Sequence, residues 1–171
     1  GNKFLANIRE VDAIIHVVRC FEDENIVHVD GTVNPVNDKE VIDIELQMKD
    51  LESIEKRIQR LQKVAKTGDP KAKKGIAIAE KIKEVLESGQ NVRSLELNDE
   101  ELESIHDLHL LTIKPVIYVA NVDEGSVTDG NEHVEALKEA VKNENAQVLI
   151  ISAAIEAEIA TLETTEEKLE F

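Results

Sequence analysis

The sequence predicts an α/β protein in which a parallel sheet is interrupted by a long helical insertion. Three stretches, residues 13–20, 115–121 and 148–152, are almost continuously apolar and rich in β-branched side chains. Such runs are typical of strands that are buried on both faces of a parallel sheet. Between the first and the second, apolar residues recur at spacings of three and four, which places them on one stripe of a helix.

The pattern of the helical stretch predicts an antiparallel pair of helices. Asn37, followed three residues later by Glu40, resembles a capping box and predicts the start of the first long helix. Residues 67–70 break this helix and begin a second one with Asp69 as its cap, and Gly89 ends the second helix. Two apolar stripes joined by a short turn must face each other, so we expect a helical hairpin.

These patterns divide the chain into three parts. Residues 1–37 and 113–171 carry the strands, and residues 38–112 carry the helices. The helical part ends with a third helix, capped by Asn98 or Asp99, whose inward side chains we expect to be Leu102, Ile105 and Leu108. In the last part, an amphipathic helix at 133–143 between two apolar strands predicts a βαβ unit.

Composition limits the possible functions. Apolar residues make up 42% of the chain, which is enough for a core, and no apolar run is long enough for a membrane span. Cys20 is the single cysteine, so we expect no disulfide and a reducing, cytoplasmic setting. The formal charge of −16 repels phosphate groups, so we do not expect this chain to bind nucleic acid.

Polar turns follow two of the predicted strands, where ligands sit in open parallel sheets. One is Asn121-Val122-Asp123-Glu124 and the other is Ser152-Ala153-Ala154. P-loop GTPases place base-recognition loops at such positions, and their guanine loop is Asn-Lys-x-Asp. Here Asn121 fits, whereas Val122 and Glu124 replace the Lys and the Asp. The alternative is an ordinary turn between a strand and a helix.

Several stretches of the sequence, taken together, resemble the YchF group of Obg-like ATPases. They include residues 1–9 (GNKFLANIR), 16–21 (HVVRCF) and 25–29 (NIVHV). The match continues in order through residues 111–115, 118–121 and 152–154.

The resemblance implies a P-loop-type G domain that is split by a coiled-coil-like insertion and prefers ATP to GTP. It also implies a ribosome-associated switch protein, a carboxy-terminal TGS domain and a Mg²⁺ ion. The TGS domain, the phosphate loop (Gly-x-x-x-x-Gly-Lys-Ser/Thr), the first switch and the Asp-x-x-Gly motif are absent from this sequence. We expect the last three, with the Mg²⁺ ligands, to precede Gly1, so that this stretch alone would not hydrolyse ATP.

The resemblance assigns nucleotide binding to the two strand-end loops. Asn121 and the backbone at Val122 would contact the base, with the Val122 side chain packed on it, and Ser152, Ala153 and Ala154 would complete the site. Glu124 is one methylene longer than the Asp of guanine loops. The longer side chain moves the carboxylate away from the position in which it accepts two hydrogen bonds from guanine, so ATP is favoured.

His28 is a candidate catalytic residue. The family resembles GTPases in which an apolar residue replaces the catalytic Gln, so a loop histidine could position the water; a surface histidine is the alternative. His106 and His109 have no accompanying Cys or third His, so we expect no metal site there. The competing function is a non-catalytic helical module that binds a protein partner.

Overall fold

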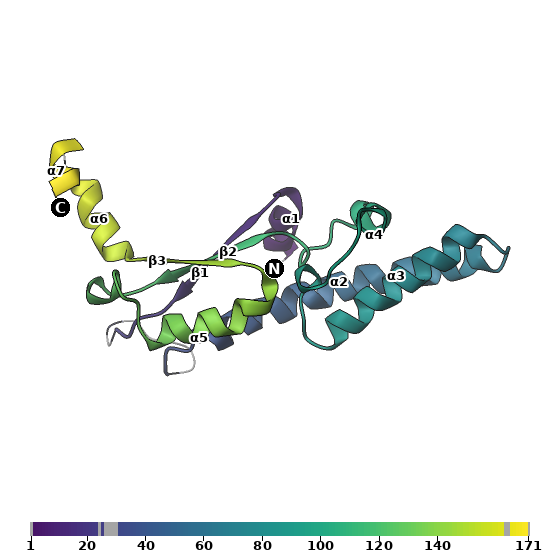
Figure 1. Cartoon of the computed structure of the whole chain (residues 1–171), viewed down its shortest axis with the longest axis horizontal. Helices are drawn as coiled ribbons and strands as arrows, with labels where there is room; N and C mark the ends of the chain where they lie inside the picture. The colour runs from purple at the N-terminus through teal and green to yellow at the C-terminus, as the bar shows by residue number, and fades with distance from the viewer. Residues whose placement is uncertain (1, 24, 26–30, 163–164, 171) are drawn as a thin grey trace. The chain divides into compact units, whose positions relative to one another are not determined.

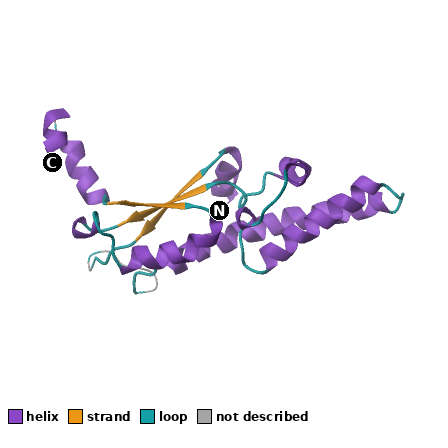
Figure 2. Cartoon of the chain, in the orientation of Figure 1, coloured by secondary structure: helices purple, strands orange, loops and turns teal. Residues whose placement is uncertain are grey.

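The computed structural model describes residues 2–23, 25, 31–162 and 165–170, and helical segments separate its three strands along the chain (Figure 1 and Figure 2). Among these residues, no helix is both long enough and apolar enough to cross a membrane. The elements are α1 Asn2–Glu10, β1 Ile14–Arg19, α2 Pro35–Ala65, α3 Pro70–Glu87, α4 Asp99–Ile105, β2 Val116–Asn121, α5 Glu132–Val141, β3 Gln147–Ile151, α6 Ala153–Thr161 and α7 Thr165–Glu170.

The chain forms two compact units. The helical unit contains residues 1–14, 40–115 and 143–145, and the sheet unit contains residues 15–39, 116–142 and 146–171. Each unit is assembled from segments that are far apart in the sequence.

The sheet unit is built on three strands in the order β1-β2-β3. β2 pairs with β3 in parallel, with Asn121 opposite Ile151 at the carboxyl end. Helix α5 connects these two strands and packs against β3, so the predicted βαβ unit is present. Asn131 begins α5 by accepting a hydrogen bond from the Val134 amide (3.0 Å).

The strands differ from the sequence prediction because one face of the sheet is open. Along β1, Val18 is 2% exposed, whereas its neighbour Val17 is 59% exposed. Ile117 and Leu149 are exposed in the same way on β2 and β3. Successive side chains of a strand point to opposite faces of the sheet. Apolar side chains therefore lie on both faces of this sheet, but only one of the two faces is covered. The expectation of strands buried on both faces was therefore wrong for this structure.

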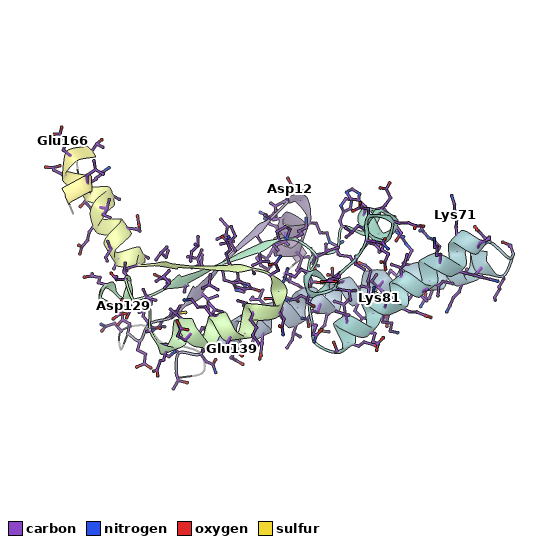
Figure 3. All side chains as sticks on the ribbon, in the orientation of Figure 1. Asp12, Lys71, Lys81, Asp129, Glu139 and Glu166 are labelled. Carbon is purple, nitrogen blue, oxygen red and sulfur yellow. The ribbon has the colours of Figure 1, made fainter. Side chains whose placement is uncertain are left out.

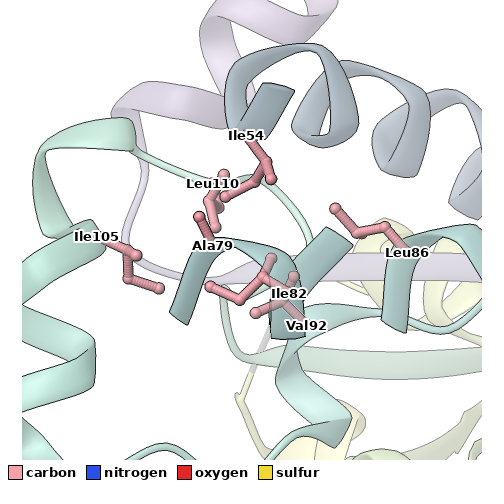
Figure 4. Close-up of a cluster of buried hydrophobic side chains, with 7 residues drawn as sticks. All are labelled: Ile54, Ala79, Ile82, Leu86, Val92, Ile105 and Leu110. Atoms are coloured by element: carbon pink, nitrogen blue, oxygen red, sulfur yellow. The ribbon is translucent and has the colours of Figure 1, made fainter. Parts of the chain in front are cut away.

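In the helical unit, α2 and α3 run antiparallel. Leu61 lies against Gly75 near the turn, the Lys83 ammonium lies 3.3 Å from the Glu55 carboxylate, and the Gln47 amide donates to the Gly89 carbonyl at the far end. A buried apolar cluster holds the two helices together with α4 and the neighbouring loops (Figure 4). Its fully or almost fully buried members are Ile54, Ala79, Ile82, Leu86, Val92, Ile105 and Leu110.

The capping residues that begin the helices in the structure agree only in part with those predicted from the sequence. Asp69 caps α3 by accepting from the Lys71 amide, with Pro70 in the first turn, and Asn98 forms a capping box with Glu101 at α4, as predicted. Helix α2 instead begins at Pro35, because Asn34 Oδ1 accepts from the Asn37 amide (3.0 Å). The start predicted from Asn37 and Glu40 was therefore too late.

The inward side of α4 also differs from the expectation. Ile105 is buried, whereas Leu102 is 40% exposed and does not belong to the core cluster. Helix α4 has only seven residues, and Ile105 is its one member of the core cluster; Leu108, in the 3₁₀ helix His106–Leu108 that follows, packs against that cluster as expected.

A buried carboxylate fastens the loop before β2 to helix α2. Asp50 accepts hydrogen bonds from the Leu111 amide (2.7 Å), the Thr112 amide (2.8 Å) and the Thr112 hydroxyl (2.7 Å). Thr112 Oγ1 in turn accepts from the Val92 amide (3.1 Å). Burial raises the pKa of the Asp50 carboxyl, and the three hydrogen bonds oppose this rise.

Candidate functional site

The candidate site lies in the sheet unit, where the carboxyl ends of β2 and β3 come together. The parallel register brings Asn121 beside Ile151, and the Val122 amide donates to the Ile151 carbonyl (2.8 Å). The two loops that sequence reasoning selected, 121–124 and 152–154, are therefore neighbours, although Asn121 and Ala153 lie 32 positions apart in the chain.

The Asn121 side chain links these loops directly. Its Oδ1 accepts a hydrogen bond from the Ala153 amide (3.0 Å), and its backbone carbonyl accepts from the Cys20 amide (2.7 Å). Because a backbone N–H is only a donor, the amide oxygen must be the atom that faces Ala153. The Nδ2 group of Asn121 is then the donor that the side chain offers to a ligand.

Ser152 acts at this site as a helix cap. The residue is 3% exposed, and its hydroxyl accepts from the Ile155 amide (3.4 Å) at the start of α6. Ala153 and Ala154 follow with exposed, small side chains, which leaves their backbone accessible. Ser152 therefore holds the shape of the loop, whereas Ala153 and Ala154 lie on its open side.

A cavity of about 420 Å³ opens between these loops and the end of β1. Four carboxylates lie around it, two from each side: Glu22 and Asp23 after β1, and Asp123 and Glu124 after β2. The complete lining is Phe21, Glu22, Asp23, Asn121, Val122, Asp123, Glu124, Gly125, Ala153 and Ala154. Five of the six nucleotide-binding residues predicted from the sequence thus line one cavity, and the sixth, Ser152, caps the adjoining helix.

Two predicted residues occupy different positions in this cavity from those expected. Val122 as a whole residue is only 2% exposed, and its amide donates to the Ile151 carbonyl, so its side chain does not present the open surface on which a base was expected to pack. Glu124 begins the short 3₁₀ helix Glu124–Ser126, and its carboxylate is exposed at the rim. Phe21, which is half-buried, supplies the aromatic surface of the lining.

Sequence reasoning missed the contribution of the segment after β1. The Arg19 guanidinium lies over the Phe21 ring at 4.9 Å and donates to the Phe21 carbonyl (3.1 Å), which holds this turn in place. Asn131 Nδ2 donates to the Cys20 carbonyl (2.7 Å) and ties the same turn to α5. The sequence did contain a signal for this segment. Ligands sit at the carboxyl ends of parallel strands, and this rule applies equally to the strand that ends at Arg19.

Cys20 adjoins the site and is fully buried. Burial, aided by the nearby negative charge of Asp38, raises the pKa of its thiol to about 11. The thiol therefore stays protonated at neutral pH and is a packing group, not a nucleophile. His28 lies outside the described residues, so its proposed role stays a prediction.

The chain has relatives of similar sequence among known proteins. No protein-family model matches the chain. The "Ribosome-binding ATPase YchF" of Bacillus subtilis is 49% identical over 171 residues, covering 99% of this chain and 47% of that protein. The protein of the same name from Haemophilus ducreyi is 52% identical, covering 100% and 47%. The chain is a homologue of YchF.

A solved structure extends the likeness to three dimensions. The YchF GTPase of Schizosaccharomyces pombe superposes with a TM-score of 0.86 at 35% sequence identity, covering 99% of this chain and 47% of that one. This confirms the predicted α/β class with a parallel sheet, and it supports a P-loop-type G domain. The chain spans about half the length of the YchF proteins that it matches.

Proposed function

We propose that this chain supplies the base-binding part of a YchF-type switch protein that binds and hydrolyses ATP, binds GTP more weakly and associates with ribosomes. Residues 1–37 and 113–171 would belong to its G domain, and residues 38–112 would form an inserted coiled-coil module. The curated YchF relatives are named ribosome-binding ATPases, whereas the solved relative is described as a GTPase. Base preference is therefore the property that the site must explain.

The hydrogen bond from the Ala153 amide to Asn121 Oδ1 is the observation that carries this proposal. It directs the donor side of the Asn121 amide to any ligand in the cavity. N7 of a purine is an acceptor in both adenine and guanine, so this contact would bind either base without distinguishing them. Phe21 offers a face on which the base would stack.

Discrimination between the bases would then depend on the loop after Asn121. A guanine-specific site needs a carboxylate that accepts from N1 and N2, and Glu124 is longer than the Asp that does so in guanine loops. Adenine instead presents an N6 amine, which a backbone carbonyl near Val122 would accept. Because Glu124 is exposed and on a longer stem, we expect weak discrimination that favours ATP.

Mg²⁺ is expected to accompany the nucleotide, and we place its ligands outside this chain. Within the described residues, no group of three or more His, Cys, Asp or Glu side chains could hold a metal ion. The ion would neutralise phosphate charge when bound. The residues described here would bind and orient the base.

The test compares ATP and GTP binding in a full-length protein that carries this sequence. Glu124→Asp should raise the affinity for GTP relative to ATP about tenfold, equivalent to one regained hydrogen bond of about 1.4 kcal/mol. Glu124→Gln is the matched control, because it keeps the length and removes the charge, and it should not gain GTP affinity. A wild-type protein that already binds GTP much more tightly than ATP would refute the proposal.

A further inference from the structure

The first half of α2 carries an apolar stripe that is open to solvent. It consists of Val41, Ile44 and Met48, here called the α2 stripe, which are 56%, 54% and 66% exposed. Their spacing of three and four places them on one side of the helix. The same spacing continues to Leu51, which packs against the core cluster of the helical unit. The apolar pattern of α2 thus extends about two turns beyond the part of the helix that this core covers.

The stripe is open because α3 ends before it would cover these residues. Helix α3 ends at Glu87, and the Gly89 carbonyl just beyond it accepts from the Gln47 side-chain amide (3.2 Å). The antiparallel helix has therefore ended at the level of Gln47, and it does not run beside Val41 or Ile44.

Other sides of this part of α2 are already in use. Leu46 belongs to a buried cluster with Leu5 and Ile8 of α1. At about 100° per residue, Ile44 faces away from Leu46. Asp50 is buried and accepts hydrogen bonds from the loop before β2. The α2 stripe is therefore an additional apolar side of the helix, and the packing of the helical unit does not use it.

Acidic side chains border the α2 stripe. At about 100° per residue, Glu40 lies on one side of the stripe and Glu45 on the other. Both side chains are exposed, and they form no ion pair with any residue that the structure describes. Residues 40–55 contain six acidic residues and one basic residue, Lys49, so a partner for this surface needs positive charge beside an apolar face.

We propose that the α2 stripe binds a basic amphipathic helix of a partner protein. The apolar side chains of such a helix recur at spacings of three and four and would pack on Val41, Ile44 and Met48. Its Lys and Arg side chains would border this contact and pair with Glu40 and Glu45. Met48 suits this role because its flexible thioether side chain adapts to the shape of a partner. The inference goes beyond the proposed nucleotide site and does not depend on it.

The acidic borders are unfavourable for the other possible occupants. Glu40 and Glu45 would repel the phosphate groups of a nucleic acid or of an anionic membrane surface. A second copy of this chain, packed through the same stripe about a two-fold axis, would place the same carboxylates of both copies at one contact. A basic partner is the occupant that relieves this charge.

The test measures the binding of a fluorescein-labelled peptide of about 18 residues to the 171-residue chain by fluorescence anisotropy. In this peptide, Leu occupies helix positions i, i+3, i+4 and i+7 of each repeat, and Lys occupies the bordering positions. A scrambled peptide of the same composition keeps the charge but loses the apolar face. The wild-type chain should bind the amphipathic peptide at least about tenfold more tightly than the scrambled one.

Two variants separate the apolar contribution from that of charge. Ile44→Ser with Met48→Ser removes two of the three apolar contacts and should weaken binding at least about tenfold at every salt concentration. Glu40→Gln with Glu45→Gln removes the bordering charges and should weaken binding about threefold to tenfold at low salt. At about 1 M salt this second difference should almost disappear, because salt screens exposed charges.

Each variant has a matched control. Val64→Ser with Leu102→Ser changes two exposed apolar side chains of the helical unit outside the stripe. Asp129→Asn with Glu166→Gln removes two exposed carboxylates of the sheet unit, and both residues are labelled in Figure 3. Both controls should bind the peptide like the wild type, and circular dichroism should show the same helix content for all the proteins.

The same titration with a full-length protein that carries this sequence should also show binding. If only the 171-residue chain binds the peptide, the rest of the protein covers the stripe and the proposal is wrong. Analytical ultracentrifugation gives a second check. A wild-type dimer that Ile44→Ser with Met48→Ser converts to a monomer would identify a second copy as the occupant instead.

The proposal is also overturned if the scrambled peptide binds as tightly as the amphipathic one, or if the stripe and control variants weaken binding equally. Because the assay contains no ATP or GTP, a failure of the proposed nucleotide site would leave its result unchanged.

Discussion

Asn121 joins the two loops of the candidate site and, in the proposed function, also contacts the base, and a single substitution can separate these two tasks. Asn121→Asp keeps an oxygen to accept from the Ala153 amide but removes the Nδ2 donor, whereas Asn121→Ala removes both. In the full-length protein, Asn121→Asp should weaken ATP and GTP binding equally, by up to about tenfold for one lost hydrogen bond, with little change in Tm. Asn121→Ala should weaken both nucleotides and also lower the Tm. If Asn121→Asp leaves both affinities unchanged, Nδ2 does not contact the base.

Cys20 allows a test of burial beside the site by pH. The pKa of its thiol is about 11, compared with an ordinary value of 9.0, so the native protein contains much less of the reactive thiolate. At pH 8 the native protein should therefore react with a thiol reagent at least about a hundredfold more slowly than the urea-unfolded chain. The folded state also holds this proton more tightly than the unfolded state. Stability should therefore fall as the pH rises from about 9 to 11, and Cys20→Ala should remove that contribution. Equal reaction rates for native and unfolded protein would contradict the burial.

Asp50 connects α2 to the segment that leads into β2. Asp50→Asn replaces one acceptor oxygen by an NH₂ group that faces backbone donors, so the free energy of unfolding should fall by about 2–3 kcal/mol, measured by urea unfolding. Glu52→Gln, two residues along the same helix, is the control, because Glu52 is exposed and its loss should leave stability nearly unchanged. A similar small effect for both variants would show that the three hydrogen bonds contribute little.

The pKa of Asp50 gives this connection a predictable pH dependence. Because burial raises the pKa in the folded state, the carboxyl contributes stability that is present at acid pH and is lost as the pH rises through the folded pKa. The difference in unfolding free energy between the wild type and Asp50→Asn should therefore decrease from acid to neutral pH.

The open face of the sheet can be tested on β1 with two adjacent valines. Val18→Thr buries a hydroxyl and should lower the free energy of unfolding by about 1–3 kcal/mol, whereas Val17→Thr places the same group in water and should have little effect. Urea unfolding of both variants measures the difference. Equal destabilisation would indicate that both faces of the sheet are covered in solution.

For the molecule as a whole, the two units predict that the helices fold without the sheet. A piece comprising residues 38–111 should be mainly helical by circular dichroism and should melt cooperatively, because its core cluster lies within α2, α3, α4 and the adjoining loops. Leu46 and Leu111 lose their contacts with Leu5 and Ile8 of α1 in this piece, so it should melt below the intact chain. A strand-rich spectrum would contradict the prediction.

A core substitution provides the matched check on that piece. Ile82 is fully buried, so Ile82→Ala should destabilise it by about 2–5 kcal/mol. Ala77→Ser, on the exposed side of the same helix, should change the melting temperature little.

Local sequence patterns were sufficient to predict the class of fold, the three strands, helices α2 to α5 and the two strand-end loops of the candidate site. Such features depend on β-branched apolar runs, on apolar spacing of three and four, and on the capping residues Asp69 and Asn98. Five of the residues that line the cavity were found because the carboxyl ends of neighbouring parallel strands meet at one edge of the sheet. They are Asn121, Val122, Glu124, Ala153 and Ala154.

Tertiary packing was needed to establish which sides of those elements are covered and what each polar group does. Val17 and Val18 are identical in type, and their different exposure depends on which face of the sheet is covered. Ser152 acts as a cap, Phe21 joins the site, and Asp50 meets Thr112 across 62 positions of the chain. Contacts of this kind join segments that are distant in sequence, so their energies depend on packing that no local pattern encodes.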